Sequence, residues 1–511
     1  MFMLSGSNMC GRGQVRPMMF SVFLLLLFSL EVIKSQFLVK TLPGLVGDLP
    51  FTLETGYVGV GEFDEVKLFY YFIESEGNPK DDPLLLWLSG GPGCSSIVGL
   101  IYEIGPFTFN SEISTVENPI LEIVPDRLTK AANIIFLDQP AGSGFSYAKT
   151  PEAYIMNDTL STIHTHDFLR KWLMDHPKFF NNPLYLGGDS YTGIVLPMLV
   201  QEIYNGIEVG EWPQINIEGY MLGNPLTDLT NDYNSRIPFA HRMALLSDEI
   251  YKSVKENCHG DYLNVDPNNV MCIHDLQLVD NSLKNVKGVH ILEPACPRSD
   301  SLEVDPFIAG IRANNKTSMD ILPQVQNQSC REESYVYTYA WANRRDVREA
   351  LHIAEEFGDT EWVQCNETLH FHFDKDAVTS YTPNVMSSVD YHRNFTDKKC
   401  RALIYSGDHD MLVPYFSTMK WVGSLNLSVI DDWRPWLVDE QVAGYTMKYS
   451  KGEYKLTYAT IKGGGHTAPE YKHKECLTMF MRWLANDTVN HEYVGLLLKK
   501  SGDEGLSFST I

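Results

Sequence analysis

Residues 183–197, PLYLGGDSYTGIVLP, constrain the fold of this chain more than any other stretch. An apolar run ends in two glycines and is followed by residues whose apolar spacing is typical of one face of a helix. This order predicts a strand, a sharp turn at Ser190 and a helix. Such a turn exposes the serine hydroxyl, and small neighbours, here Gly188 and Gly193, let the strand and the helix pass closely. The usual pattern has glycine where this chain has Thr192, so an ordinary glycine-rich turn stays an alternative at this point.

The charge and the first residues of the chain narrow the possible classes of protein. A formal net charge of −24 over 511 residues argues against nucleic acid and anionic membranes as partners. Arg12 and Arg16 precede an apolar run at 18–30, which is short for a membrane span and has the charge order of a secretory signal. The sequence therefore predicts a signal over 1–35, cleaved near Ser35, with a membrane anchor as the alternative. No later segment is long and apolar enough to span a bilayer.

Cysteines and sequons both indicate passage through the secretory pathway. Nine cysteines are spread widely without close CxxC pairs, so disulfides are expected and a zinc site is not. The first of them, Cys10, would be lost with the signal. Seven Asn-x-Ser/Thr sequons without a middle proline predict surface asparagines that can carry glycans. These are Asn157, Asn315, Asn327, Asn366, Asn394, Asn426 and Asn486.

Strand and helix patterns alternate over much of the chain. Short apolar runs predict strands and amphipathic runs predict helices, and their alternation implies a mostly parallel sheet wrapped by helices. The run at 84–88, LLLWL, is continuously apolar and is expected to be buried on both faces. The predicted strands are 67–73, 84–88, 133–138, 184–186, 217–222, 401–406 and 456–461, and the predicted helices include 158–175, 344–353 and 475–485.

The alternation breaks down in the middle of the chain, where cysteines, prolines and sequons gather. We interpret this part as a disulfide-stapled, largely helical cap inserted into an α/β domain. The expected organisation is a signal segment at 1–35, a catalytic domain formed by 36–226 and 344–486, a cap insertion at 227–343 and a weakly patterned tail at 487–511.

Three predicted strands end at side chains that could form a catalytic triad. A serine hydroxyl becomes a nucleophile when a histidine takes its proton, and the histidine needs a carboxylate to hold its tautomer. In α/β-hydrolases these groups follow the order serine, acid, histidine, each after a strand. This chain has Ser190, then a loop with Asp408 and Asp410, then three glycines and His466. Asp410 is the expected acid because it precedes a Val-Pro turn from which it can reach across, whereas Asp408 is expected to cap its loop.

A glycine-rich loop, SGGPGCSS, follows the buried strand at 84–88. Glycine backbone at such a place can bring N–H groups close to a ligand, which is what an oxyanion hole needs. A plain turn is the alternative for this loop.

Six motifs together make a resemblance specific: LWLSGGPGCSS, FLDQPAGSGFSY, GGDSYTG, MLGNP, YSGDHDMLVP and GGGHTAPEY. They resemble motifs of the serine carboxypeptidase-like family, over a stretch from about Val39 to Leu484. The similarity is greatest to the plant acyltransferase branch, whose members move an acyl group from a 1-O-acyl-β-glucose ester to an alcohol acceptor. The resemblance implies an α/β-hydrolase fold, with Ser190 as nucleophile, His466 as general base and acid, and Asp410 as its orienting carboxylate.

The resemblance also implies further site residues and a disulfide pattern. The N–H groups of Gly91 and Tyr191 would bind the oxyanion. Four residues would contact the substrate: Ser89, Gly90, Glu103 and Asp189. The cysteine pairs would be Cys94 with Cys365, Cys258 with Cys272 and Cys296 with Cys330, leaving Cys400 and Cys476 free.

Two departures from the peptidases of this family bear on function. The peptidases have asparagine where this chain has Ser89 and glutamate where it has Asp189, and these groups, with an acid matching Glu103, bind the C-terminal carboxylate of a peptide. The hydroxyl of Ser89 and the shorter side chain of Asp189 should weaken binding of that carboxylate. A site that relies on particular hydrogen bonds to its ligand discriminates strongly when one of them is missing. Asp189 also occurs in the acyltransferase branch. We therefore expect acyl transfer from an acyl-glucose donor to a hydroxyl acceptor through an acyl-serine intermediate.

Two other functions stay open at this stage. One is a serine carboxypeptidase that releases C-terminal residues, with Ser89 and Asp189 as tolerated drift. The other is an inactive binding protein on the same fold, which is disfavoured because the triad and both oxyanion loops are intact. No metal or organic cofactor is expected, and the expected location is the vacuole or the extracellular space. The polar stretch at 298–328 is a candidate for excision that would leave two disulfide-linked chains.

Overall fold

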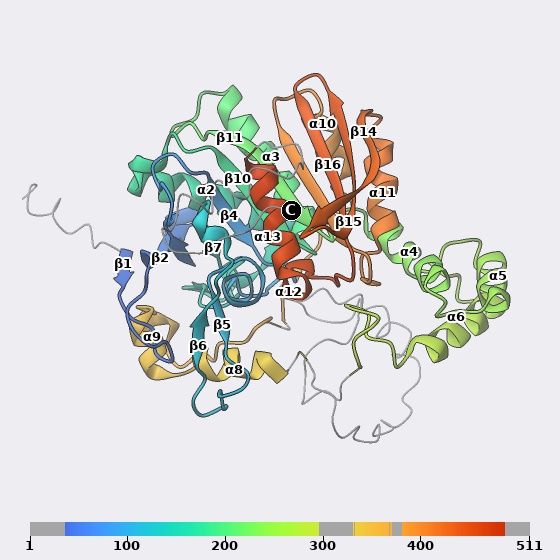
Figure 1. The fold of residues 1–511 in the computed structure, drawn as a ribbon, viewed down its shortest axis with the longest axis horizontal. Helices are drawn as coiled ribbons and strands as arrows, with labels where there is room; N and C mark the ends of the chain where they lie inside the picture. The colour runs from blue at the N-terminus through green and yellow to red at the C-terminus, as the bar shows by residue number, and fades with distance from the viewer. Residues whose placement is uncertain (1–35, 296–330, 332, 367, 370–380, 486–511) are drawn as a thin grey trace, which may run out of the picture.

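The computed structural model of this chain describes residues 36–295, 331, 333–366, 368–369 and 381–485 (Figure 1). The predicted signal, the predicted excision at 298–328 and the predicted tail lie outside these residues. A 12-stranded sheet forms the centre, with the strand order β1-β2-β3-β7-β4-β10-β11-β13-β16-β15-β14, and β8 pairs with β3. Its strands are β1 (Gln36–Val39), β2 (Leu53–Val60), β3 (Val66–Ile73), β4 (Leu84–Leu88), β7 (Asn133–Leu137), β8 (Tyr147–Ala148), β10 (Leu184–Asp189), β11 (Ile217–Gly223), β13 (Arg401–Gly407), β14 (Ser428–Val438), β15 (Gln441–Lys451) and β16 (Tyr454–Ile461).

The six central strands, from β7 through β4, β10, β11 and β13 to β16, run parallel, and the flanking strands pair antiparallel. This confirms the predicted α/β class with a mostly parallel central sheet. Because parallel strands place their carboxyl ends at one edge, the loops after β4, β10, β11, β13 and β16 meet there. Two small sheets stand apart, formed by β5 (Phe107–Phe109) with β6 (Leu121–Ile123) and by β9 (Met156–Asn157) with β12 (Tyr381–Thr382).

Helices cover both faces of the sheet. Strand β4 is fully buried, as predicted, because Leu86 packs into the core on one face and Trp87 into the core on the other. Helices α2 and α3 contribute to the first core, and helix α13 contributes to the second. The helices are α2 (Asp158–Asp175), α3 (Thr192–Glu208), α4 (Leu229–Arg242), α5 (Asp248–Asn257), α6 (Val270–Leu283), α8 (Glu333–Ala342), α9 (Arg345–Ala350), α10 (Val389–Phe395), α11 (Tyr415–Ser424), α12 (Ala468–Tyr471) and α13 (His473–Leu484).

Short helical turns connect several of these elements. They are the 3-10 turns η1 (Glu62–Asp64), η3 (Leu128–Lys130), η4 (Glu152–Tyr154), η5 (Pro177–Phe179) and η6 (Glu355–Phe357), and the π-helical segment η2 (Gly99–Glu103). Among the described helices, none combines the length and the apolar character that a membrane crossing needs.

The hairpin of β14 and β15 at one end of the sheet was not predicted. Its residues do not alternate cleanly between apolar and polar, because Asp431, Asp432 and Pro435 interrupt β14. Most residues of β14 are exposed or half-buried. The strand therefore does not need the alternation of apolar and polar residues by which strands are recognised in a sequence.

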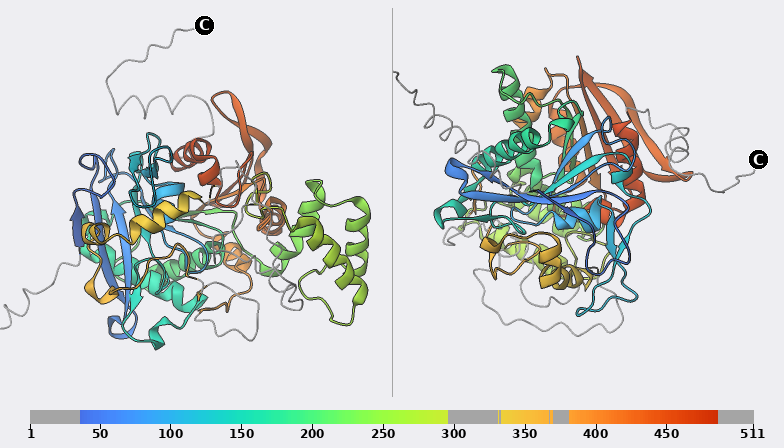
Figure 2. Two further views of the ribbon diagram at one scale, coloured as in Figure 1. Left: turned by 90° about the horizontal axis from the view of Figure 1, so that it is seen from below. Right: turned by 90° about the vertical axis from the view of Figure 1, so that its left-hand side faces the viewer.

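Helices α4, α5 and α6 in the insertion have a small core of their own. The left panel of Figure 2 shows the green helices α5 and α6 extending to the right of the sheet. Helix α8 differs from them, because Trp341 is buried in the second core of the sheet. The division into a catalytic domain and a cap at 227–343 therefore stays a prediction.

Candidate active site

Ser190 lies in the sharp turn between β10 and α3 with a backbone φ of 56°, in the left-handed region that is costly for a residue with a side chain. Two backbone hydrogen bonds hold the turn, because Ser190 N donates to Gly223 O at 2.9 Å and Leu226 N donates to Ser190 O at 2.9 Å. A Cβ at Gly193 would lie 2.5 Å from Leu226 O, so glycine is required one position later than in the usual pattern. The predicted strand, turn and helix are present.

Three side chains that are far apart in the sequence form a hydrogen-bonded chain at the carboxyl edge of the sheet. The Nδ1 atom of His466 is 2.8 Å from Asp410 Oδ2, and its Nε2 atom is 2.7 Å from Ser190 Oγ. Because the Asp410 carboxylate can only accept, Nδ1 carries the proton and Nε2 can accept the proton of the serine hydroxyl. This geometry is that of a nucleophile, a base and an orienting acid.

Asp410 is fully buried and is fixed by donors besides His466. The side chain of Asn224 donates to Asp410 Oδ2 at 2.8 Å, and Leu412 N donates to Asp410 Oδ1 at 2.7 Å. Asn224 was not among the predicted site residues, although its position directly after the predicted strand at 217–222 was a usable signal. Asp408 instead accepts from Gly463 N at 2.7 Å, which matches its expected role in holding the loop.

The loop after β4 lies against the Ser190 turn. A Cβ at Gly90 would lie 2.7 Å from Ser190 Cβ and 3.1 Å from Tyr191 N, so the two backbones approach as closely as glycine allows. Gly91 has a φ of 120°, which a residue with a side chain rarely adopts. Among the described residues, no hydrogen-bond acceptor is recorded for the N–H of Gly91 or of Tyr191. Two backbone donors beside the serine are what an oxyanion hole needs.

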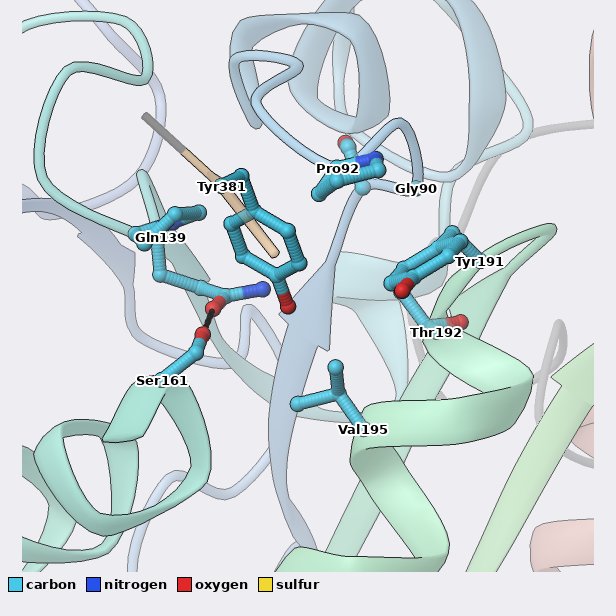
Figure 3. A pocket seen from close by; sticks show the side chains of 10 residues that line it. Gly90, Pro92, Gln139, Ser161, Tyr191, Thr192, Val195 and Tyr381 are labelled. Carbon is cyan, nitrogen blue, oxygen red and sulfur yellow. Dashed lines mark hydrogen bonds between the residues drawn. The ribbon is translucent and has the colours of Figure 1, made fainter. Parts of the chain in front are cut away.

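The side chain of Tyr191 anchors the nucleophile turn to helix α2. Its hydroxyl donates to Asp158 Oδ1 at 2.8 Å, and the hydroxyl of Tyr381 donates to the same atom at 2.9 Å. Figure 3 shows Tyr191 and Tyr381 on opposite sides of a small cavity, with Ser161 bonded to Gln139 below them. Asp158 is fully buried and accepts from both tyrosine hydroxyls, so it restricts how the residue after Ser190 can move.

Two buried carboxyl groups, Glu103 and Asp189, interact with each other beside the nucleophile. Burial and the neighbouring Asp189 raise the pKa of Glu103 well above its ordinary value of 4.5, although Trp87 Nε1 donates to it at 2.7 Å. Burial also raises the pKa of Asp189, to about 6, against the lowering effects of His466 and of the Glu103 hydrogen bond. We infer that Glu103 holds the proton and donates it to Asp189. Ser89, also buried, has its Oγ without a hydrogen-bond partner among the described residues.

We expect Glu103→Gln to reduce the pH dependence of stability. The folded protein keeps a proton on Glu103 that the unfolded chain releases above about pH 4.5. The folded state therefore binds more protons, and the free energy of unfolding falls as the pH rises from about 4.5 toward the folded pKa. Glutamine can donate to Asp189 and accept from Trp87 without titrating. Denaturant unfolding at pH 5 and pH 8 measures this, with the exposed Glu112→Gln as control. An equal pH dependence in wild type and Glu103→Gln would contradict it.

Some of the predicted disulfides and sequons lie within the described residues and can be compared with the structure. Cys94–Cys365 and Cys258–Cys272 are present as expected, and Cys400 and Cys476 are free and buried. The third predicted pair, Cys296 with Cys330, lies outside the described residues. So do three of the predicted sequon asparagines, Asn315, Asn327 and Asn486.

The four described sequons differ in accessibility. Asn394 and Asn426 are exposed, as a glycan requires. Asn157 and Asn366 are half-buried, so they are less exposed than the predicted surface positions. Asn366 Nδ2 donates to Gly142 O at 2.9 Å, and Asn157 Oδ1 caps helix α2. A glycan on Asn366 would use this same nitrogen and would disturb the contact with Gly142.

Comparisons with known proteins agree on one family. A family model described as serine carboxypeptidase matches residues 43–486. Serine carboxypeptidase-like 10 of Arabidopsis thaliana is 46% identical over 464 residues, which cover 91% of this chain and 98% of that protein. Serine carboxypeptidase-like 19 of the same plant is 45% identical and covers 91% of this chain and 97% of its own length. A solved prohormone-processing carboxypeptidase from Saccharomyces cerevisiae has a TM-score of 0.67 at 18% identity, over 87% of this chain and 94% of that chain.

The central parallel sheet and the strand, turn and helix around Ser190 define an α/β-hydrolase fold, as predicted. Within that class, the chain belongs to the serine carboxypeptidase family. The motifs quoted from the sequence identified this family correctly.

Proposed function

We propose that this protein is an acyltransferase that moves an acyl group from a 1-O-acyl-β-glucose ester to the hydroxyl of an alcohol or sugar acceptor. Ser190 Oγ attacks the ester carbonyl while Nε2 of His466 takes the hydroxyl proton. The N–H groups of Gly91 and Tyr191 bind the oxyanion of the tetrahedral intermediate. Glucose leaves with the proton from His466, and the acyl group stays on Ser190. The acceptor hydroxyl then gives its proton to His466 and attacks the acyl-serine, which releases the new ester.

The observation that carries this choice is that Ser89 and Asp189, both buried beside the nucleophile, replace the asparagine and the glutamate of the peptidases. The pKa of Asp189, at about 6, leaves its carboxylate ionised at neutral pH, and a second acid, Glu103, lies against it. In the peptidases of this family the corresponding groups hydrogen-bond the C-terminal carboxylate of a peptide, and the shorter side chain of Asp189 and the hydroxyl of Ser89 displace or withdraw those bonds. A glucose ester carries no charge, and its hydroxyl groups can donate to a carboxylate. The unpartnered hydroxyl of Ser89 supports the same preference for a neutral, polyhydroxylated donor.

We expect the acyl-enzyme to react with an acceptor alcohol faster than with water. A bound and oriented hydroxyl gains an effective concentration that can reach about 10⁵ M or more, which loosely held water does not. The measurement supplies benzoyl-, cinnamoyl- and isobutyryl-glucose with a panel of alcohols and quantifies ester against free acid. A blocked dipeptide supplied in parallel reports carboxypeptidase activity. Ester should predominate with at least one acceptor, and the dipeptide should stay intact.

Two variants test whether Ser89 and Asp189 set this preference. Ser89→Asn with Asp189→Glu should increase dipeptide cleavage relative to transfer. Free acid with every acceptor, together with release of C-terminal residues by the wild type, would favour the carboxypeptidase and reject the transferase. If the double variant leaves the ratio unchanged, the preference does not arise from these two positions.

The proposed location is the secretory pathway, ending in the vacuole or outside the cell. The two disulfides of the described chain support an oxidising compartment. The arginines and the apolar run at 1–35 support the same route.

A further inference from the structure

Residues 288–291, in the insertion between β11 and β13, lie against both loops that carry the acid and the base. They contact His409 and Met411, which flank Asp410, and they also contact His466. Three backbone hydrogen bonds make these contacts: Met411 N donates to Gly288 O at 2.9 Å, His466 N donates to Val289 O at 2.8 Å, and Ile291 N donates to His409 O at 3.1 Å.

Gly465, the last of the three glycines before His466, lets this segment approach. A Cβ at Gly465 would lie 2.6 Å from Val289 O and 2.8 Å from His290 Cδ2. Glycine loops have many accessible backbone conformations, so Gly463–Gly464–Gly465 alone would hold His466 poorly. The close contact with Val289 and His290 compensates for that freedom.

The side chain of His290 adds a fourth contact to the same loop. Its ring is buried, and its Nε2 atom lies 3.2 Å from Gly463 O, to which an N–H can donate. Leu292 N donates to its Nδ1 atom at 3.3 Å, so Nε2 is the nitrogen that carries the proton. The ring also stacks on His409, with 5.7 Å between centroids, and packs at a tilt on Tyr471, at 4.7 Å.

We propose that residues 288–291 form a clamp that sets the distance between Asp410 and His466, with His290 as its positioning residue. The inference rests on the proposed catalytic role of Ser190, His466 and Asp410. In this proposal, part of the insertion between β11 and β13 helps to align the triad.

The size of the effect follows from the geometry of proton transfer. His466 must hold Nε2 within hydrogen-bonding distance of Ser190 and Nδ1 within the same distance of Asp410, as it does at 2.7 and 2.8 Å. A displacement of about 1 Å in such an arrangement can lower a rate about 100-fold. We expect His290→Ala to lower the rate of acylation about 10- to 100-fold, with little change in KM, because no substrate contact is removed.

Labelling of Ser190 by phenylmethanesulfonyl fluoride tests the clamp without assuming the natural substrate. Ser190 Oγ forms a bond to sulfur, fluoride leaves, and His466 takes the serine proton, so the rate reports triad geometry alone. His290→Ala should label about 10- to 100-fold more slowly than wild type. His290→Gln should recover most of the rate, because its Nε2–H can still donate to Gly463 O. His274→Ala, whose side chain is 62% exposed on α6, is the matched control and should label normally.

The outcomes separate the clamp from the proposed function. Wild-type labelling rates in both His290→Ala and His290→Gln would overturn the clamp. Slow labelling by His290→Ala with recovery by His290→Gln would support it, even if the wild type neither transfers acyl groups nor cleaves peptides. Should His290→Ala unfold, as circular dichroism would reveal, His290→Phe takes its place, because it keeps a ring but has no donor for Gly463 O: slow labelling supports the clamp, and labelling near the wild-type rate overturns it.

Discussion

Ser190→Ala and His466→Ala are each expected to lower turnover about 10⁴- to 10⁶-fold, because the members of a nucleophile and base pair act as one unit. The hydroxyl of Ser190 bonds only to His466 among the described contacts, and both backbone bonds of the turn survive in alanine. The fold should therefore persist. The measurement is the single-turnover rate with an acyl-glucose, alongside the melting temperature of each variant.

The double variant makes this prediction sharper. Ser190→Ala with His466→Ala should lose no more activity than either single variant, because each single change already removes the whole function of the pair. The exposed His259 provides a matched control, and His259→Ala should keep wild-type turnover. A loss of less than about tenfold in either single variant would remove that residue from the mechanism.

Replacing Cys94 and Cys365 together with serine should cost both stability and activity. The bond joins residues 271 apart in the sequence, so its loss frees a long loop in the unfolded chain and lowers the free energy of unfolding by about 4 kcal/mol. The same bond holds the loop that carries Gly91, together with Ser95 N donating to Gln364 O at 2.8 Å and Asn366 N donating to Gly93 O at 3.0 Å. Displacing Gly91, the oxyanion donor proposed above, should cost about 10²- to 10³-fold in turnover.

The second disulfide separates these two effects. Cys258 and Cys272 are 14 residues apart and join helices α5 and α6, which pack in the small core of the insertion. Their double serine variant should lose stability and keep turnover once folded. Stability is measured by denaturant unfolding, and turnover is measured below the unfolding transition. Wild-type turnover in the Cys94→Ser, Cys365→Ser variant would show that the disulfide does not position the loop.

Local patterns predicted the elements that are buried in the sheet. The LLLWL run became β4, and the run ending at Gly187 and Gly188 became β10, because a strand buried on both faces must be apolar throughout. The hairpin of β14 and β15 was missed for the complementary reason, since a largely exposed strand is under no such requirement.

Some residues of the candidate site were also predicted from local patterns, and one was not. Ser190, Asp410 and His466 were identified because each follows a strand and because their chemistry requires that order of residue types. Asn224 lies in the quoted motif MLGNP but was not predicted as a site residue, because the motif does not say which side chain it contacts, and only the structure places it 2.8 Å from Asp410.

The sequence by itself determined the family, the α/β class and two of the disulfides, and it predicted the three residues that the structure joins by hydrogen bonds at the candidate site. These features depend on short motifs and on their order along the chain, which can be recognised without knowing any distance between residues. Only the tertiary structure decided which buried groups interact and which backbones touch. The Glu103–Asp189 pair and the contact of Val289 with His466 join residues that are 86 and 177 positions apart. Contacts of this kind depend on how loops from separate strands meet at one sheet edge, and no local pattern of residues encodes that meeting.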